Sequence, residues 1–195
     1  MLKRLAATAA FALGMFQAVS AMTALPALAA SAPSVSSPTC AITSGTLEVL
    51  ENAADIAVST DGTSLFVSDG AGPCADPSTF ALADIDAADF QDDGGSITFD
   101  LEETDTPDRV ADYGTIDYTV AADNTVTLQG AGLHDSRADL DVIVDDTSFD
   151  AGTLVADLYT TRFTFFGGDG DDSFDATRVY DFPTVADGGD GNDVL

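Results

Sequence analysis

Two short stretches near the C-terminal end contain the residues best suited to chemistry. Residues 167–175 read Gly-Gly-Asp-Gly-Asp-Asp-Ser-Phe-Asp, and residues 188–195 read Gly-Gly-Asp-Gly-Asn-Asp-Val-Leu. Glycines let the backbone turn tightly and bring carbonyl oxygens close to one point. The acidic side chains add hard, anionic oxygens, and Ca²⁺ takes about six to eight such oxygens in a flexible geometry. One turn supplies too few ligands, so a site needs at least two stacked turns.

Both stretches match the pattern G-G-x-G-x-D-x-U-x, in which U is a large apolar residue, here Phe174 and Leu195. On this motif the chain resembles the RTX (repeats-in-toxin) family of secreted calcium-binding proteins, over residues 167–195 only. The resemblance implies a right-handed parallel β-roll in which turn carbonyls and the Asp at the sixth position bind Ca²⁺. The ligand positions that it implies are Gly167, Asp169, Gly170, Asp171, Asp172, Gly188, Asp190, Gly191, Asn192 and Asp193. A flexible Gly/Asp-rich linker is the alternative, but it would not need an apolar residue in register with both turns.

The spacing of the motifs departs from the family pattern. Tandem nonapeptides stack turns on one side at steps of about eighteen residues, whereas here the motifs start at 167 and 188, which are 21 residues apart. Residues 176–187 stand where an intervening turn is expected, so three extra residues must be accommodated. The last repeat also stops one residue short at Leu195. We therefore expect further repeats beyond this end; a short chain that caps itself by self-pairing is the alternative.

The charge balance is strongly acidic. Lys and Arg total 6 against 34 Asp and Glu, for a formal net charge of −28, and the acids divide into 30 Asp and 4 Glu. Asp favours turns whereas Glu favours helices, so most acids are expected in turns between strands. This charge excludes nucleic acids and anionic membrane surfaces as partners, because both require basic patches. It also makes the compact state repel itself unless cations bind.

Residues 1–29 are predicted to be a secretory signal peptide. Lys3 and Arg4 form a positively charged start, residues 5–22 are rich in Ala and Leu, and residues 27–29 are Ala-Leu-Ala, which suits cleavage. A retained membrane anchor is the alternative, and no stretch of the mature chain is apolar enough to span a bilayer. Cleavage removes two positive charges and takes the net charge from −28 to −30. The predicted location is therefore extracellular.

Export predicts an oxidising compartment for the two cysteines. Cys40 and Cys74 both lie in the mature part, so we expect a disulfide between them, with two free thiols as the alternative. The bond would close a loop of roughly 35 residues and stabilise the fold by about 3–4 kcal/mol.

Between a Pro- and Ser-rich leader at 30–39, expected to be disordered, and the two motifs, short alternating segments predict strands. Their residues are β-branched or aromatic, the period is two, and Gly, Asp or Asn separate them. The predicted strands are 46–50, 63–68, 96–101, 115–120, 125–128, 140–144, 153–159 and 162–166, and residues 79–91 predict a short helix. We expect an all-β fold, with a β-rich domain at 40–160 and the start of a calcium-binding β-roll at 161–195. The first domain is a solenoid or a sandwich, and the likeness of 145–151 to 171–176 favours the solenoid.

Enzyme motifs are absent from the sequence, which has neither G-x-S-x-G nor H-E-x-x-H. Residues 134–136 are His-Asp-Ser, but consecutive residues cannot converge as a catalytic triad. Carboxylate pairs such as 92–93, 102–103 and 145–146 arise by number alone in so acidic a chain. We therefore predict a non-catalytic calcium-binding protein. Two alternatives stay open: a calcium-rigidified adhesin or surface-associated protein, and the N-terminal part of a longer RTX toxin or hydrolase.

Overall fold

The computed structural model describes residues 39–51, 54–69, 72–74, 79–101, 109–130 and 140–195. Every described residue belongs to one compact unit, Ser34–Leu195. The predicted signal peptide, nearly all of the predicted leader and the His-Asp-Ser stretch at 134–136 lie outside the described residues.

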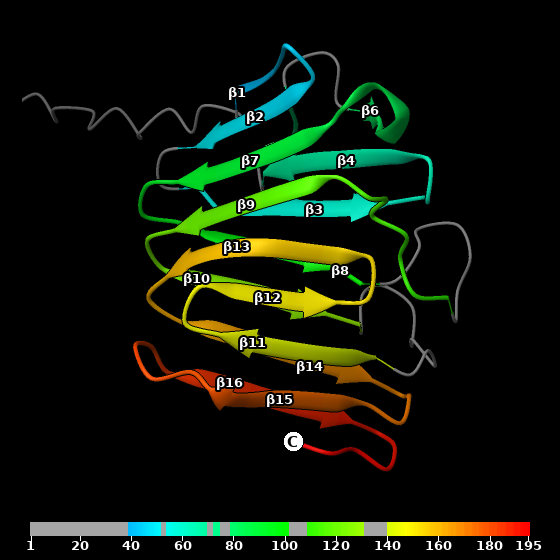
Figure 1. The fold of residues 1–195 in the computed structure, drawn as a ribbon, viewed down its shortest axis with the longest axis vertical. Helices are drawn as coiled ribbons and strands as arrows, with labels where there is room; N and C mark the ends of the chain where they lie inside the picture. Colours follow the sequence, from blue (N-terminus) through cyan, green and yellow to red (C-terminus); the bar gives the residue numbers. More distant parts are fainter. Residues whose placement is uncertain (1–38, 52–53, 70–71, 75–78, 102–108, 131–139) are drawn as a thin grey trace, which may run out of the picture. The chain divides into compact units, whose positions relative to one another are not determined.

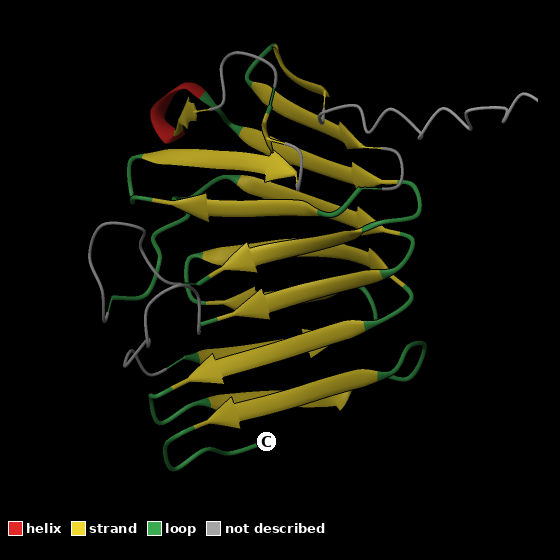
Figure 2. Cartoon of the chain, turned by 180° about the vertical axis from the view of Figure 1, so that it is seen from behind, coloured by secondary structure: helices red, strands yellow, loops and turns green. Residues whose placement is uncertain are grey.

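Apart from one 3₁₀ turn, the regular secondary structure of the described residues is β-strand, arranged in two mixed sheets that lie one behind the other (Figure 1, Figure 2). Sheet A contains, in spatial order, β1 (Thr39–Thr43), β2 (Thr46–Glu51), β7 (Ala87–Asp92), β9 (Asp117–Ala122), β13 (Leu154–Thr160), β12 (Ser148–Ala151), β11 (Asp141–Asp145) and β15 (Ser173–Arg178). Sheet B contains β16 (Thr184–Gly189), β14 (Phe163–Gly168), β10 (Thr125–Gln129), β8 (Ser96–Asp100), β3 (Ile56–Thr60), β4 (Ser64–Asp69) and β5 (Gly72–Pro73), with β6 (Thr79–Ala81) paired to β4. The predicted all-β class is confirmed, and the two facing sheets resemble a sandwich.

From β7 onward the chain repeatedly crosses between the sheets, since β7, β9, β13 and β15 belong to sheet A and β8, β10, β14 and β16 to sheet B. Strands that return to the same sheet pair in parallel, as β7 does with β9 and β10 does with β14. Two antiparallel excursions interrupt the pattern, β3–β4 in sheet B and β11–β12–β13 in sheet A. Because β8, β10, β14 and β16 run the same way, the turns that follow β14 and β16 lie at the same end of these strands.

The core fills the space between the sheets. Inward residues alternate with outward ones along strands such as β2 and β4, which is why the period-two pattern marked these strands correctly. A row of aromatic rings continues through the core, each within 5.5–6.2 Å of the next, in the order Phe90, Phe99, Phe149, Phe163 and Phe174. These rings come alternately from sheet A and sheet B, so they join the two layers along much of their length.

Two hairpins are closed by the same aspartate geometry. Asp61 Oδ1 accepts hydrogen bonds from the backbone N–H groups of Thr63 and Ser64 between β3 and β4, at 2.9 and 2.8 Å. Asp145 Oδ1 accepts the equivalent bonds from Thr147 and Ser148 between β11 and β12, both at 2.9 Å. Part of the large Asp content therefore serves local turn formation.

The predicted short helix at 79–91 is wrong. This stretch contains β6, a single 3₁₀ turn at Leu82–Asp84, and most of β7. Ala88 and Phe90 point into the core at about 1% and 0% exposure, because β7 pairs in parallel with both β2 and β9. Tertiary pairing therefore overrides the local preference of the Ala-rich segment.

The predicted disulfide is confirmed between Cys40 and Cys74, whose Cα atoms are 5.8 Å apart. Cys40 lies in β1 of sheet A, and Cys74 directly follows β5 of sheet B. The bond therefore joins the two sheets near the start of the described chain. Within the described residues, no helix has the length and apolar character needed to cross a membrane.

Candidate metal site in two stacked turns

The two glycine-rich motifs form turns that follow neighbouring strands of sheet B. The first turn, residues 167–172, leaves the end of β14 and leads to Ser173 at the start of β15. The second turn, residues 188–193, leaves the end of β16 and leads to Val194, which forms an isolated parallel bridge with Ser173. Both turns thus connect the sheet B side of the molecule to the sheet A side.

The two turns lie directly against each other. β14 and β16 pair in parallel, and Gly168 is the register partner of Gly189. Asp190 N donates to Gly168 O at 2.8 Å, and Val194 N donates to Asp172 O at 2.8 Å. The 21-residue step between the motifs is therefore compatible with turn-on-turn stacking.

The three extra residues are accommodated on the opposite side, in the connection between β15 and β16. There Asp146 Oδ1 accepts a hydrogen bond from Asp181 N at 2.9 Å, and another from Tyr180 N. Asp146 lies in the β11–β12 hairpin of the layer above. A side-chain hydrogen bond to a neighbouring turn therefore holds this connection, which lacks the glycine-rich motif.

Several glycines are required by the close approach of the two turns. A Cβ atom added at Gly189 would collide with Gly168 O, and one at Gly191 would collide with Gly170 O. At Gly167 an added Cβ would meet the carboxylate of Asp172 and, at 2.5 Å, Gly188 O. Close packing of carbonyls and carboxylates is thus the reason for glycine at these positions.

The aspartates at the sixth motif position connect successive layers. Asp193 Oδ1 accepts a hydrogen bond from Asp172 N at 3.0 Å, and Asp172 Oδ1 accepts one from Leu140 N at 2.8 Å. Asp171 Oδ1 adds a further link by accepting from the backbone N of Asn192 at 2.9 Å and its Nδ2 at 3.1 Å. The carboxylates predicted as ligands are therefore also parts of the stacking.

The electrostatic environment of the two turns is uniformly negative. They contain five aspartates and no Lys or Arg. Asp172 is buried at 1% exposure, Asp193 is half-buried, and Asp169 and Asp190 are exposed. Like charges this close disfavour the ordered turns unless a cation compensates them. In the described residues, however, no group of three or more His, Cys, Asp or Glu side chains gathers closely enough to hold a metal ion.

A hollow of about 290 Å³ opens beside the two turns. It is lined by Phe166, Gly167, Gly168, Asp169, Asp187, Gly189 and Asp190. Asp187 was not among the predicted ligands, and it is the register partner of Phe166 on the neighbouring strand. Its position immediately before the Gly-Gly pair is the sequence signal that could have identified it. The hollow therefore combines three carboxylates with glycine backbone.

The ten predicted ligand positions fall into two groups. Those in one turn lie next to their counterparts in the other, as Gly170 does beside Gly191 and Asp171 beside Asn192. The buried Asp172 is not part of the lining of the hollow, which includes Asp169 and Asp190. The arrangement offers carbonyl oxygens and exposed carboxylates on the outside, with the sixth-position aspartates beneath them.

Three described members of the acidic pairs noted in the sequence, Asp92, Asp145 and Asp146, use their carboxylates to hold turns. Asp92 is buried at 2% exposure and its Oδ1 accepts from Gly95 N at 2.8 Å, which closes the turn after β7. Asp145 and Asp146 hold the two turns described above. Glu102 and Glu103 lie outside the described residues.

No protein-family model, curated protein or solved structure matches the chain. The resemblance to the RTX family therefore depends on the two motifs, and the stacking of their turns is the structural observation that bears on it.

Proposed function

We propose that the chain is an exported protein that binds Ca²⁺ through the stacked turns 167–172 and 188–193. The observation that carries the proposal is their stacking, with Gly168 opposite Gly189. A single glycine-rich turn offers too few oxygens for Ca²⁺, and two stacked turns bring a second set within reach. The uniformly negative charge of the turns adds an electrostatic reason for a cation.

The residues that would hold the ion are turn carbonyls and carboxylates. Carbonyl oxygens would come from glycine-rich positions such as Gly167, Gly170 and Gly188, with carboxylates from Asp169 and Asp190 at the hollow. The sixth-position Asp172 and Asp193 would contribute carboxylates that already contact the neighbouring layer. A bound Ca²⁺ supplies positive charge that offsets repulsion between the turns, so its role is structural rather than catalytic.

The last layers are further proposed to be the beginning of an RTX-type β-roll. Parallel pairing of β14 with β16 and of β11 with β15 supports this proposal, as does the crossing from one sheet to the other at each turn. Export is supported by the Cys40–Cys74 disulfide, because such bonds persist in oxidising compartments.

Calorimetric titration of residues 31–195 with CaCl₂ tests the function. Saturable binding is expected at about 10⁻⁴–10⁻³ M, the range of extracellular calcium modules. Asp169→Asn and Asp190→Asn should each weaken binding, whereas Asp84→Asn removes the same charge from the exposed 3₁₀ turn and should leave it unchanged. Equal losses in all three variants would indicate general charge screening, and absence of saturable binding would overturn the proposal.

A further inference from the structure

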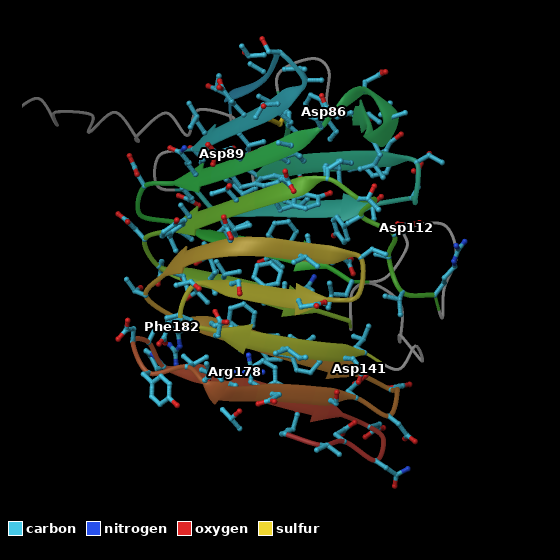
Figure 3. The ribbon with its side chains drawn as sticks, viewed as in Figure 1. Asp86, Asp89, Asp112, Asp141, Arg178 and Phe182 are labelled. Carbon is cyan, nitrogen blue, oxygen red and sulfur yellow. A yellow bond between two sulfur atoms is a disulfide. The ribbon has the colours of Figure 1, made fainter. Side chains whose placement is uncertain are left out.

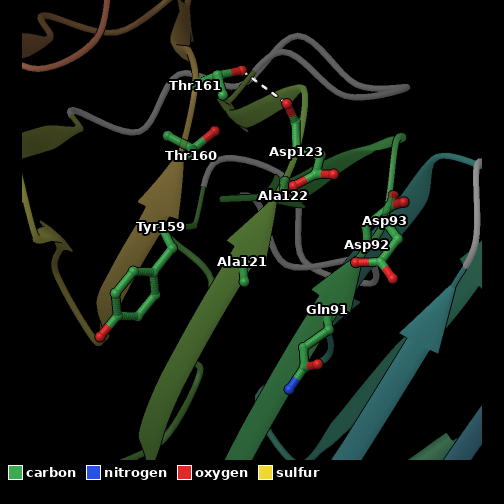
Figure 4. Close-up of a pocket in the computed structure, with 9 residues that line it drawn as sticks. All are labelled: Gln91, Asp92, Asp93, Ala121, Ala122, Asp123, Tyr159, Thr160 and Thr161. Atoms are coloured by element: carbon green, nitrogen blue, oxygen red, sulfur yellow. Dashed lines mark hydrogen bonds between the residues drawn. The ribbon is translucent and has the colours of Figure 1, made fainter.

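The outer face of sheet A carries a second hollow, of about 250 Å³, at the ends of β7, β9 and β13. Its lining includes Gln91, Asp93, Ala121, Asp123, Tyr159 and Thr161 (Figure 4). Figure 1 places these strand ends on the opposite side of the sheets from the turns 167–172 and 188–193. The hollow is therefore separate from the proposed calcium site.

A row of three residues crosses the floor of this hollow. Gln91 is the register partner of Ala121, and Ala121 is the register partner of Tyr159. Neighbouring strands are about 4.8 Å apart, so Tyr159 and Gln91 stand roughly 10 Å from each other. Only the methyl group of Ala121 lies between them, which leaves space for one ring of pyranose size.

Tyr159 offers an aromatic surface in this acidic setting, because the residue is 62% exposed. An exposed aromatic ring stacks favourably on the C–H face of a sugar while its hydroxyl group stays in water. Gln91 Nε2 donates to Asp89 Oδ2 at 2.9 Å, which orients the Gln91 amide on the strand. Asp89, labelled in Figure 3, and Gln91 are two residues apart on β7, so their side chains lie on the same face of the strand. The floor thus combines a ring with an oriented amide.

The rim of the hollow is polar and locally braced. Thr161 Oγ1 lies 2.9 Å from Asp123 O and 2.7 Å from Asn124 O, so its single hydroxyl proton is shared between these carbonyls and ties the end of β13 to the turn after β9. The exposed Asp93 and Asp123 carboxylates can accept hydrogen bonds from hydroxyl groups. Donors and acceptors around one exposed ring suit a polyol better than a simple cation, which needs acceptors only.

We propose that this face of sheet A binds neutral carbohydrate, with one pyranose ring over Ala121 between Tyr159 and Gln91. The net charge of −28 repels anionic sugars, so uronate and sulfated glycans are excluded as ligands. The proposal does not depend on calcium binding by the glycine-rich turns.

Neutral hexasaccharides of β-1,4-glucose, β-1,4-N-acetylglucosamine and mannose are the probes, with hexalysine as the cationic comparison. Binding to the secreted chain is measured by calorimetry and by saturation-transfer NMR, in CaCl₂ and in EDTA. At least one sugar should bind, with the same affinity in both conditions. Tyr159→Ala should weaken its binding by about tenfold or more, since ring stacking is lost.

Two further variants separate the site from unspecific effects. Ala121→Gln fills the gap on an exposed strand face and should abolish sugar binding while leaving the circular dichroism spectrum unchanged. Tyr180→Ala removes an even more exposed tyrosine, at 81%, on another part of the chain and should have no effect. If Tyr159→Ala fails to fold, Ala121→Gln decides the result.

The proposal is overturned if none of the sugars binds, or if binding survives both Tyr159→Ala and Ala121→Gln. It is equally overturned if hexalysine alone binds in a Tyr159-dependent way, because the hollow would then be a cation site. If the wild-type chain binds sugar but does not bind calcium, the proposed function is refuted and this inference still holds.

Discussion

Asp193 Oδ1 accepts a hydrogen bond from the backbone N–H of Asp172, 3.0 Å away. Asp172 repeats this relationship one layer higher, where its Oδ1 accepts from Leu140 N at 2.8 Å. Each sixth-position aspartate therefore holds the backbone of the layer above it. If these carboxylates also bind Ca²⁺, ion binding and ordering of the turns are thermodynamically coupled.

Asp193→Ala should loosen the second turn even without calcium. The Asp172 N–H would lose its acceptor, at a cost of about 1–3 kcal/mol where it remains shielded from water. Amide hydrogen exchange measured in EDTA should show faster exchange at Asp172, with Asp84→Ala as the matched control. Unchanged exchange at Asp172 would show that this hydrogen bond does not contribute to the order of the turn. In a calcium titration the same variant should bind more weakly.

Gly191→Ala should separate the two turns, because the new Cβ would collide with Gly170 O. Overpacking of this kind typically costs about 1–3 kcal/mol. The expected results are faster proteolysis within 188–195 and a loss of calcium affinity. Val194→Ala shortens a side chain that is 69% exposed in the same segment, without that collision, and should have a smaller effect. Equal behaviour of the two variants would argue against tight stacking.

Calcium should order residues 167–195 more than the rest of the chain. The predicted β-roll starts at residue 161, but Phe163 and Phe165 are fully buried in the main core. We therefore narrow the calcium-dependent segment to the turns, β15 and β16. Hydrogen exchange with and without CaCl₂ checks this, with slowing confined to 167–195 as the expected result. Uniform slowing over both sheets would contradict it.

Reduction of the Cys40–Cys74 bond should destabilise the fold by about 3–4 kcal/mol, since the two residues are 34 apart in sequence. Denaturant unfolding of the wild-type chain and of a Cys40→Ser, Cys74→Ser double variant measures the difference. Because the bond joins β1 to the segment after β5, the loss should appear first as faster amide exchange at that end. A double variant as stable as the oxidised chain would show that packing alone joins the sheets there.

The two hairpin aspartates and Asp175 should produce a stability loss in acid. Hydrogen bonds from the Thr63 side chain lower the pKa of Asp61, those from the Thr147 backbone lower the pKa of Asp145, and those from the Thr177 side chain lower the pKa of Asp175, each from an ordinary value of 3.8. A carboxyl group with a depressed folded-state pKa stabilises the fold above its unfolded pKa, and this contribution disappears as the pH falls through the folded value. The contribution should therefore begin to decline below about pH 4 and be lost once the pH has fallen past the lowered, folded-state pKa values.

Protonation in acid also relieves the repulsion among the many carboxylates of this chain. A comparison of variants separates that general effect from the loss of the aspartate hydrogen bonds. Asp145→Asn keeps an acceptor oxygen but cannot titrate, so its stability should fall less steeply than that of the wild type between about pH 4 and pH 2. Asp84→Asn removes the same charge without changing the hairpin. Chemical denaturation at several pH values gives the slopes, and parallel slopes for Asp145→Asn and wild type would contradict the assignment.

Local sequence patterns were enough to predict most of the strands. Alternation of apolar and polar residues located segments such as β2, β8 and β10, because a strand with one buried face has a period of two. Pairing of the only two cysteines left a single possible disulfide within the chain. The repeated glycine-rich motif likewise identified two turns, since its backbone requirements are local.

These local patterns could not predict which distant strands pair with each other. On local grounds the stretch 79–91 could be helix or strand. Parallel pairing with β2 and β9 makes most of it strand β7. The 21-residue step between the motifs became a stack only because the β15–β16 connection fits beneath Asp146. The row Gln91–Ala121–Tyr159 likewise exists only through the register of three strands. Residue type thus determined which segments form strands and turns, whereas non-local hydrogen bonds and packing determined which side chains meet.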